Sequence, residues 1–497
     1  MKRTSAIAVA LAFSSGFAQA DPKFENFSAN LPRHVYGGGW EHFVGGGIAV
    51  FDCNGDALPD IFAIGGENTA TLIRNDGGFA FSSIDVPEVT DATGVYPIDL
   101  DGDGLLDLFV LRVGPNVVLK GTGDCGFVDA TDMLGIPPKD QWSTAFTAWW
   151  EAGDARPTLA IGNYVDRNDP DGPFEACDDN EILRPSAIGY TSEILAPGFC
   201  ALSILAANDA RGRATLRLSN DRHYYVRGGY EQMWDIIDRR FLGRDDGWDT
   251  VSLWGMGIAS RDLNGDGRDD VMLTSMGDQV LQFASPEGMY VAADYSIGTY
   301  AQRPHVGDDG RPSTGWHAQF GDIDNDGRAD LFIAKGNVDQ MPGMAMADPN
   351  NLLMQMADGT FEEVAAEAGV ATIERSRGAA LADFDQDGRL DLIVANRRAP
   401  LEIYRNVTER TGNWVTISVQ QRTGNRAAIG AVVTVSASGL SQTIQQTIGG
   451  GHAGGQMLPL HFGLGQNDAA LVQVTWPEGS ITQVDAVAGD RLIITKP

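Results

Sequence analysis

The 497-residue sequence is poor in basic residues and, beyond its N-terminus, has no long apolar run. It contains 36 Lys and Arg against 67 Asp and Glu, which gives a formal charge of −31. A surface of this charge repels nucleic acid and anionic membranes, so we expect neither as a partner. Outside residues 6–17, no apolar stretch reaches the roughly 18 residues that cross a bilayer, so we expect no membrane insertion.

The sequence also lacks the common catalytic signatures. It has no Gly-x-Ser-x-Gly elbow, no His-Glu-x-x-His pair and no phosphate-binding loop. The seven histidines are scattered along the chain, and a lone histidine is more often structural than catalytic. We therefore predict no catalytic residues and a protein that is not an enzyme.

The N-terminus has the pattern of a secretory signal peptide. Lys2 and Arg3 precede the apolar residues 6–17, and Ala18 and Ala20 provide the small residues of a cleavage site. No cysteine follows that could carry a lipid anchor. We expect residues 1–20 to be removed after Ala20 and the mature chain to be secreted or periplasmic.

Cysteine is scarce as well, with only four residues, and these allow three disulfide connectivities. Cys177 and Cys200 bracket an acidic, proline-rich insertion and form the favoured pair. Cys53 and Cys125 would then pair by elimination. Four buried free thiols are the alternative, although an oxidising compartment favours disulfides.

What the chain has in abundance is one acidic loop, repeated five times. The copies read DCNGDALPD (52–60), DLDGDGLLD (99–107), DLNGDGRDD (262–270), DIDNDGRAD (322–330) and DFDQDGRLD (383–391). Calcium takes six to eight oxygen ligands, and a glycine at position 6 lets a short loop curl around one ion. Five such loops predict about five Ca²⁺ ions.

The predicted ligands are the side chains at positions 1, 3, 5 and 9 and the backbone carbonyl at position 7. By loop, they are Asp52, Asn54, Asp56, Leu58 and Asp60; Asp99, Asp101, Asp103, Leu105 and Asp107; Asp262, Asn264, Asp266, Arg268 and Asp270; Asp322, Asp324, Asp326, Arg328 and Asp330; and Asp383, Asp385, Asp387, Arg389 and Asp391. Leu58, Leu105, Arg268, Arg328 and Arg389 would bind through backbone carbonyls.

The loops do not belong to EF-hands. An EF-hand needs a bidentate Glu at position 12 and flanking helices, whereas here position 12 is always apolar. The residues after position 9 form short apolar runs at 61–64, 108–111, 331–334 and 392–395, which are typical of buried strands. Each loop is therefore predicted to join two strands.

The repeats predict an all-β, seven-bladed β-propeller. Two degenerate copies, at 150–158 and 207–215, keep the following strand but lose the ligands, so we expect no metal there. The seven copies start at residues 52, 99, 150, 207, 262, 322 and 383, which lie 47 to 61 residues apart. This period suits propeller blades over residues 21–410.

A second, smaller domain is expected over residues 411–497. Alternating apolar residues at 414–419, 431–435, 471–476 and 492–495 predict strands of a small β-sandwich, docked on the propeller or swinging from it.

Two parts of the sequence resemble known families. The FGDIDNDG style of loop at 320–327 is similar to the FG-GAP repeat of integrin α-chain propellers and to its VCBS-type relatives in bacteria. The segments NRAAIGA (425–431), HFGLG (461–465) and VTWPEG (474–479) resemble the ASPIC/UnbV domain. The combination resembles the cartilage acidic protein-like family of secreted proteins, which implies a calcium-loaded propeller. Ala57 departs from the pattern, because the other loops have glycine at this position.

A polar and aromatic stretch over 220–234 suggests a partner surface, with Tyr224, Tyr225 and Trp234 as contact residues. The alternative is that these rings pack in the core. The function that we expect is a secreted or periplasmic calcium-binding module for a protein or glycan partner. The alternatives are a hydrolase that uses the propeller channel and a structural or calcium-buffering envelope protein.

Overall fold

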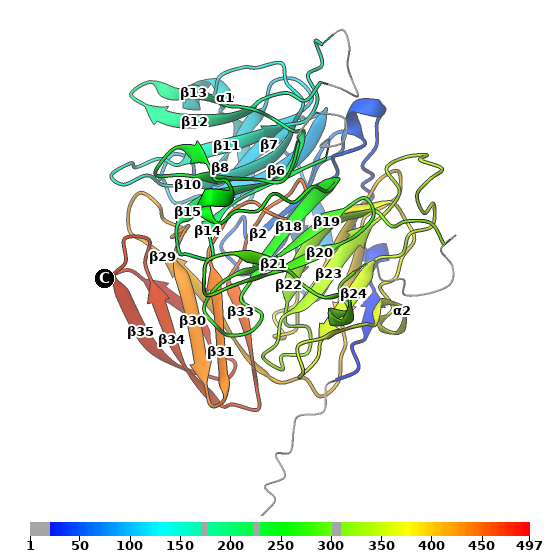
Figure 1. Ribbon diagram of the computed structural model, residues 1–497, viewed down its shortest axis with the longest axis vertical. Coiled ribbons are helices and arrows are strands. Elements are labelled where there is room, and N and C mark those ends of the chain that lie inside the picture. Colours follow the sequence, from blue (N-terminus) through cyan, green and yellow to red (C-terminus); the bar gives the residue numbers. More distant parts are fainter. Residues whose placement is uncertain (1–19, 170–175, 222–228, 301–309) are drawn as a thin grey trace, which may run out of the picture.

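The computed structural model describes residues 20–169, 176–221, 229–300 and 310–497, and these are almost entirely β-structure (Figure 1). The described helices include two short α-helices, α1 (Thr131–Leu134) and α2 (Ala365–Ala368). None of the described helices has the length and apolarity needed to span a lipid bilayer. The prediction of an all-β propeller is confirmed.

Within the described residues, seven sheets, each with four antiparallel strands, form the propeller, and we number these sheets as blades 1 to 7; a fifth, parallel strand from the C-terminal part joins the sheet of blade 1. Blades 1 to 4 contain β2 (Ile48–Phe51), β3 (Asp60–Ala63), β4 (Thr71–Asn75) and β5 (Phe81–Ile84); β6 (Ala92–Ile98), β7 (Asp107–Arg112), β8 (Val117–Gly123) and β9 (Gly126–Asp129); β10 (Ser143–Trp149), β11 (Thr158–Asn163), β12 (Asn180–Ser186) and β13 (Gly189–Leu195); and β14 (Ala201–Asn208), β15 (Ala214–Asn220), β16 (Gln232–Asp235) and β17 (Arg240–Phe241).

Blades 5 to 7 contain β18 (Gly255–Arg261), β19 (Asp270–Ser275), β20 (Val280–Ala284) and β21 (Tyr290–Ala292); β22 (Gly315–Gly321), β23 (Asp330–Lys335), β24 (Asn351–Gln355) and β25 (Phe361–Glu363); and β26 (Ser376–Ala382), β27 (Asp391–Asn396), β28 (Glu402–Asn406) and β1 (Phe24–Asn26).

The blades close into a ring. The first strand of each blade contacts the first strand of the next, and β26 of blade 7 returns to β2 of blade 1. The N-terminal strand β1 completes blade 7 by pairing with β28, with Phe24 opposite Asn406. Closure by a strand from the other end of the propeller leaves no open sheet at the joint between first and last blade.

All five acidic loops lie on one face of the ring, which we call the loop face. Each loop connects the first strand of its blade to the second, and its position-9 aspartate is the first residue of that second strand. Because these connections all leave the inner strands in the same direction, the loops gather around the end of the central channel.

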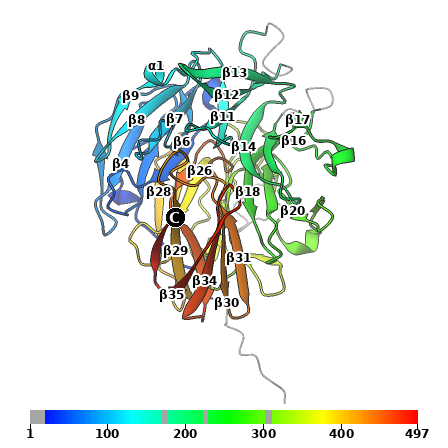
Figure 2. The same cartoon turned by 90° about the vertical axis from the view of Figure 1, so that its left-hand side faces the viewer.

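The C-terminal residues form two sheets that share one core (Figure 2). One sheet contains β29 (Asn413–Gln420), β33 (Leu460–Gly465) and β36 (Arg491–Thr495), and the other contains β30 (Val432–Ala437), β31 (Leu440–Gln445), β34 (Ala469–Thr475) and β35 (Ile481–Val487). Val415 and Phe462 of the first sheet belong to the same buried cluster as Val433 and Val472 of the second. This sandwich packs on the loop face.

One segment of the sandwich enters the ring. Residues 448–457, here called the central segment, leave the sandwich after β31 and end in β32 (Gln456–Met457), which pairs in parallel with β2. Along the way Gly450 N donates to Ile204 O at 2.8 Å, and Val95 N donates to Ala453 O at 3.0 Å. The sandwich is therefore hydrogen-bonded into the propeller axis and does not swing from a linker.

Both predicted disulfides are confirmed. Cys177 pairs with Cys200, and Cys53 pairs with Cys125, so that the described residues contain no free cysteine. The second bridge ties the first acidic loop to the hairpin between β8 and β9 of blade 2. Two disulfides are typical of proteins from oxidising compartments.

Candidate calcium loops and the domain interface

The position-9 aspartate fastens each loop to its blade. In blade 6, Asp330 Oδ2 accepts from Ile323 N at 2.8 Å, and its Oδ1 accepts from Gln355 N of the third strand at 2.8 Å. The equivalent pairs of bonds recur at Asp60, Asp107, Asp270 and Asp391. Each of these carboxylates thus holds the loop curled and still presents lone pairs to the loop interior.

The position-6 residue provides the turn that the sequence predicts. Gly104, Gly267, Gly327 and Gly388 have φ between +78° and +93°, a region that favours glycine. Ala57 adopts the same left-handed conformation, with φ of +69°. Loop 1 therefore keeps the geometry of the others at the cost of backbone strain.

The donor set in three of the loops fits a hard cation. Carboxylate oxygens from positions 1, 3 and 9 lie within 4.8 Å of one another in loop 2 (Asp99, Asp101 and Asp107), loop 4 (Asp322, Asp324 and Asp330) and loop 5 (Asp383, Asp385 and Asp391). Oxygen-only ligands grouped at this spacing suit calcium.

Loops 4 and 5 each bury a carboxylate oxygen that makes no hydrogen bond to any described residue. These atoms are Asp324 Oδ1 and Asp385 Oδ1, which occupy the same position of the two loops. The other oxygen of Asp324 accepts from Ala20 N at 3.1 Å. A buried, unpaired carboxylate oxygen is costly unless an ion occupies its lone pairs. The repetition in two loops supports a cation as the missing partner.

Without such a cation, burial disfavours the ionised form of the loop 4 carboxylates. Desolvation, followed by repulsion from neighbouring aspartates, raises the pKa of Asp322 and Asp330 well above the usual value. The same causes raise the pKa of Asp326 to about 7. A bound divalent ion would reverse this effect by stabilising the ionised form.

Basic side chains offset part of the charge in several loops. Lys120 bonds Asp101 and Asp103 in loop 2, Arg328 bonds Asp326 in loop 4, and Arg389 bonds Asp387 in loop 5. Each of these basic side chains contacts a carboxylate at position 3 or 5 of its loop. In the degenerate loop of blade 4, Arg213 pairs with Asp209 at 2.6 Å, so an arginine provides the positive charge in this loop.

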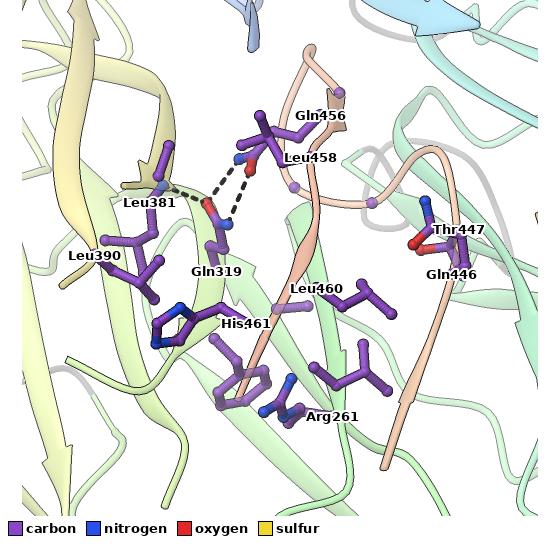
Figure 3. Close-up of a pocket in the computed structure, with 18 of the residues that line it drawn as sticks. Arg261, Gln319, Leu381, Leu390, Gln446, Thr447, Gln456, Leu458, Leu460 and His461 are labelled. Atoms are coloured by element: carbon purple, nitrogen blue, oxygen red, sulfur yellow. Dashed lines mark hydrogen bonds between the residues drawn. The ribbon is translucent and has the colours of Figure 1, made fainter. Parts of the chain in front are cut away.

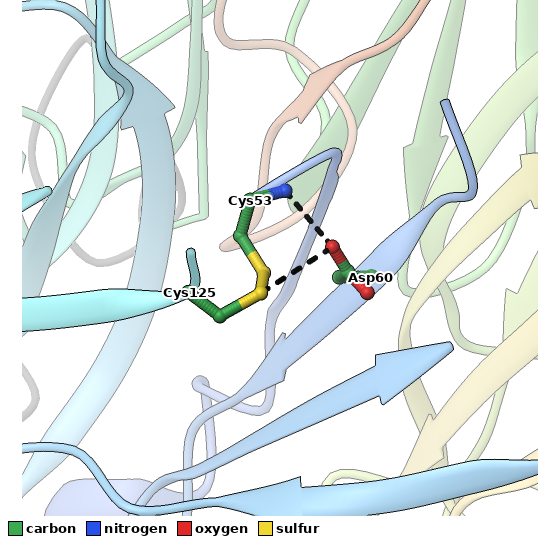
Figure 4. Close-up of side chains that lie close together, drawn as sticks. All are labelled: Cys53, Asp60 and Cys125. Atoms are coloured by element: carbon green, nitrogen blue, oxygen red, sulfur yellow. Dashed lines mark hydrogen bonds between the residues drawn. A yellow bond between two sulfur atoms is a disulfide. The ribbon is translucent and has the colours of Figure 1, made fainter. Parts of the chain in front are cut away.

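Loop 1 differs in its surroundings (Figure 4). The Cys53–Cys125 disulfide lies against Asp60, whose Oδ2 accepts from Cys53 N at 2.8 Å and lies 3.9 Å from Cys125 Sγ. Because both sulfurs are bonded to each other, neither offers a thiolate to a metal. The oxygens of loop 1 remain its only candidate ligands.

The sandwich docks directly on loops 4 and 5. His461 Nε2 lies 2.7 Å from Asn325 Oδ1, and Gly465 N donates to Asn325 O at 2.9 Å. In loop 5, a Cβ on Gly388 would lie 1.8 Å from the indole nitrogen of Trp414. Asp324 and Asn325 are fully buried as a result. Docking on the propeller was one of two expected arrangements, but the sequence did not indicate the residues of the interface, since His461 and Asn325 are 136 residues apart.

The sandwich also reaches other loops. Arg426 Nε donates to Gly102 O of loop 2 at 3.0 Å, and Arg491 lies 3.5 Å from Asp383 of loop 5. The predicted calcium loops and the C-terminal domain therefore form one site. Any ion in loop 4 or 5 would lie beneath the sandwich.

The predicted partner residues are not gathered on a described surface. Tyr224 and Tyr225 lie outside the described residues. Trp234 is only 3% exposed and packs with Trp149 and Leu216 between blades 3 and 4. For Trp234, core packing is the role that the structure gives, as the alternative interpretation of the sequence expected.

Comparisons with known proteins agree with this architecture. The family model described as FG-GAP-like repeat matches residues 52–110 and 262–333, and the model described as ASPIC and UnbV matches residues 421–497. The chain thus carries FG-GAP-like repeats in its propeller and an ASPIC and UnbV domain at its C-terminal end.

Among individual proteins, the chain is similar to cartilage acidic protein 1. It is 25% identical to the Xenopus tropicalis protein over 445 residues, which cover 80% of this chain and 63% of that protein. It is 26% identical to the human protein over 250 residues, which cover 49% of this chain and 36% of that protein. The matched part therefore spans only about a third of the human relative.

Solved structures show weak likeness. A BBS1N structure in complex with ARL6DN is 9% identical, with a TM-score of 0.42, and the match covers 79% of this chain and 94% of that one. A YCF48 structure bound to D1 peptide is also 9% identical, with a TM-score of 0.41, and covers 76% of this chain and 95% of that one. The architecture itself rests on the sheet topology described above.

Proposed function

We propose that this chain is a calcium-binding propeller of the periplasm or cell exterior, and that it acts as an interaction module for a protein or glycan partner. In this proposal about five Ca²⁺ ions occupy the acidic loops, and those in loops 4 and 5 lock the C-terminal sandwich onto the ring. The observation that carries it is the pair of buried, unbonded oxygens at Asp324 and Asp385 beneath the sandwich.

The two alternative functions have less support. A hydrolase that used the central channel would need an open channel, whereas the central segment of this chain bonds to inner strands of several blades there. A calcium buffer must exchange its ions readily, whereas Asp322, Asp324 and Asp330 are at most 1% exposed. Sites beneath a docked domain favour a structural role for the metal.

Calcium stoichiometry of the mature chain, measured by equilibrium dialysis, tests the metal part of the proposal. We expect about five ions, and the loss of one in each of the variants Asp324→Asn and Asp385→Asn. Asp209→Asn is the matched control, because Asp209 lies in a degenerate loop and pairs with Arg213. Binding of fewer than three ions, or an unchanged count in both loop variants, would contradict the assignment of loops 2, 4 and 5.

The partner part has its own test. The calcium-loaded chain is immobilised and probed with a glycan array and with envelope extract, and the same probes are applied in chelator. A ligand that binds only the calcium-loaded form, and that purified protein or glycan reproduces, supports the interaction role. Absence of any calcium-dependent ligand would favour the structural alternative.

A further inference from the structure

A pocket lies between the loop-face end of the channel and the docked sandwich (Figure 3). Its volume is about 280 Å³, close to the lower bound of small-ligand pockets, about 300 Å³. Its walls come from the ends of the inner strands, the central segment and β33. The lining includes Ala57, an exposed residue of loop 1, so the pocket reaches solvent beside that loop.

Much of the wall is apolar. Phe320, Leu381 and Leu390 line it from the propeller, and Ile444, Leu458 and Leu460 line it from the sandwich and the segment leading to it. Two polar wall residues, Gln319 and Gln456, bond to each other at 2.8 and 3.1 Å. The two side-chain amides therefore already have hydrogen-bond partners and do not require a polar ligand.

Three charged side chains line the pocket, and two of them form a pair. Arg491 lies 3.5 Å from Asp383. The third, Arg261, is at the end of β18 and is only 6% exposed, yet no carboxylate of the described residues lies within 4.0 Å of its guanidinium. Among the charged side chains of the pocket wall, Arg261 thus has no directly bonded carboxylate of the described residues, while Asp322, Asp269 and Asp262 attract it from farther away.

The contacts of Arg261 leave most of its hydrogen-bonding capacity unassigned. Its Nη2 donates to Gln442 Oε1 at the long distance of 3.3 Å, and its guanidinium carbon lies 5.7 Å from the centre of the Phe462 ring. A guanidinium has five N–H donors in a planar fork that matches a carboxylate. Burial of such a charge is costly without an anionic partner.

We propose that this pocket binds a small organic anion, a carboxylate with a short apolar body. The carboxylate pairs with the Arg261 guanidinium, and the apolar body lies against the leucine and phenylalanine wall. The ligand would contact the propeller and the sandwich together. Asp383 of loop 5 lines the same pocket, but the proposed pairing is with Arg261, which is not a calcium ligand. The proposal does not depend on the identity of the partner proposed above.

Isothermal titration calorimetry in saturating calcium tests the proposal. The probe is hexanoate, and hexanamide is the neutral control of the same length. We expect hexanoate to bind the wild-type chain one to one, hexanamide to bind at least tenfold more weakly, and Arg261→Gln to weaken hexanoate at least tenfold. Arg74→Gln removes a partly exposed arginine that pairs with Asp76, and it should leave the affinity unchanged.

A second pair of variants keeps the test decisive if Arg261→Gln does not fold. Thr447 lines the pocket and is partly buried, so Thr447→Phe should fill the cavity and abolish hexanoate binding. Thr447→Val, which has nearly the same shape as the wild type, should retain it. Equal affinity for hexanoate and hexanamide, no detectable hexanoate binding to the wild type, or unchanged binding in Thr447→Phe would each overturn the proposal.

Discussion

Replacement of Asp324 by Asn should raise stability in the absence of calcium and reduce the stabilisation that calcium provides. Asn keeps the shape of the side chain but removes one charge from the buried set in loop 4. In calcium, the variant loses a ligand charge and binds the ion more weakly. In chelator, it loses a source of repulsion, because Asp324 is one of the charges that raise the pKa of Asp330.

The magnitudes follow from the structure and from mass action. At a calcium concentration 100 times the dissociation constant, one site contributes about 2.7 kcal/mol, and a 100-fold loss of affinity leaves about 0.4 kcal/mol. Calcium should therefore stabilise the variant by about 2.3 kcal/mol less than it stabilises the wild type. Without calcium, two ionised carboxylates 4.8 Å apart repel by about 3.5 kcal/mol at an effective dielectric constant of 20, and protonation relieves part of this repulsion, so the variant should gain about 1–3 kcal/mol.

Thermal melting in about 1 mM calcium and in chelator measures both effects. For a chain of this size, 1 kcal/mol should shift the melting temperature by roughly 2 °C. Asp209→Asn again provides the control: it breaks an ion pair with Arg213 at 2.6 Å and should lower stability equally in both conditions. If Asp324→Asn behaved like this control, with the same loss in both buffers, loop 4 would not be a calcium site.

Three other perturbations have clear expected outcomes. Gly388→Ala should destabilise the chain more than the control Gly359→Ala, as measured by chemical denaturation. Both glycines have φ near +85°, but only Gly388 lies against the indole of Trp414 in the sandwich. Equal losses of stability would contradict the docking contact. Ala57→Gly should raise stability by about 0.5–1 kcal/mol, since it relieves a left-handed alanine, and an unchanged melt would refute that strain. Burial lowers the pKa of His317 to about 4 and that of His452 to about 3, so the folded chain binds fewer protons than the unfolded chain below pH 6.5. In saturating calcium, each of these histidines should therefore lower the free energy of unfolding by about 3 kcal/mol as the pH falls from 6.5 to 4. A Gln replacement at either position should make the free energy of unfolding depend less on pH, which denaturation at several pH values measures.

The repeated parts of the fold were predictable because their signals are local. The apolar runs predicted after four of the five acidic loops became β3, β7, β23 and β27, and the position-9 aspartates mark where these strands begin. Repetition made the pattern secure, since each blade repeats the same buried second strand. The two disulfides followed from the expected oxidising compartment and from the small number of cysteines.

Other strands of the same molecule had no such signal. β1 is three residues long and is a strand because Phe24 faces Asn406 at the closure of the ring. β33 contains two glycines, and β35 is largely exposed, so neither has an apolar run. Their pairing depends on neighbours distant in the chain, which no local pattern of residues encodes.

The central segment was the least predictable element. Its sequence, GGGHAGG at 449–455, has the composition of a flexible linker, yet its glycines allow close approach to the inner strands. A Cβ on Gly454 would lie 2.2 Å from Ile48 O. The glycines are needed because they are small, and not because they are flexible. The sequence alone does not distinguish these two reasons, since the distinction depends on how closely the central segment approaches the inner strands.

The central segment also bears on how the molecule is made. A ribosome releases the inner strands of all seven blades before it synthesises residues 448–457, which supply hydrogen bonds to β2, β6, β14 and β18. The axis of the ring can be completed only after synthesis of the last domain has begun. Contacts of such long sequence separation slow folding and leave an incomplete ring exposed meanwhile. We therefore expect this protein to finish folding after translation, and shortened chains that end before the sandwich to depend on chaperones for solubility.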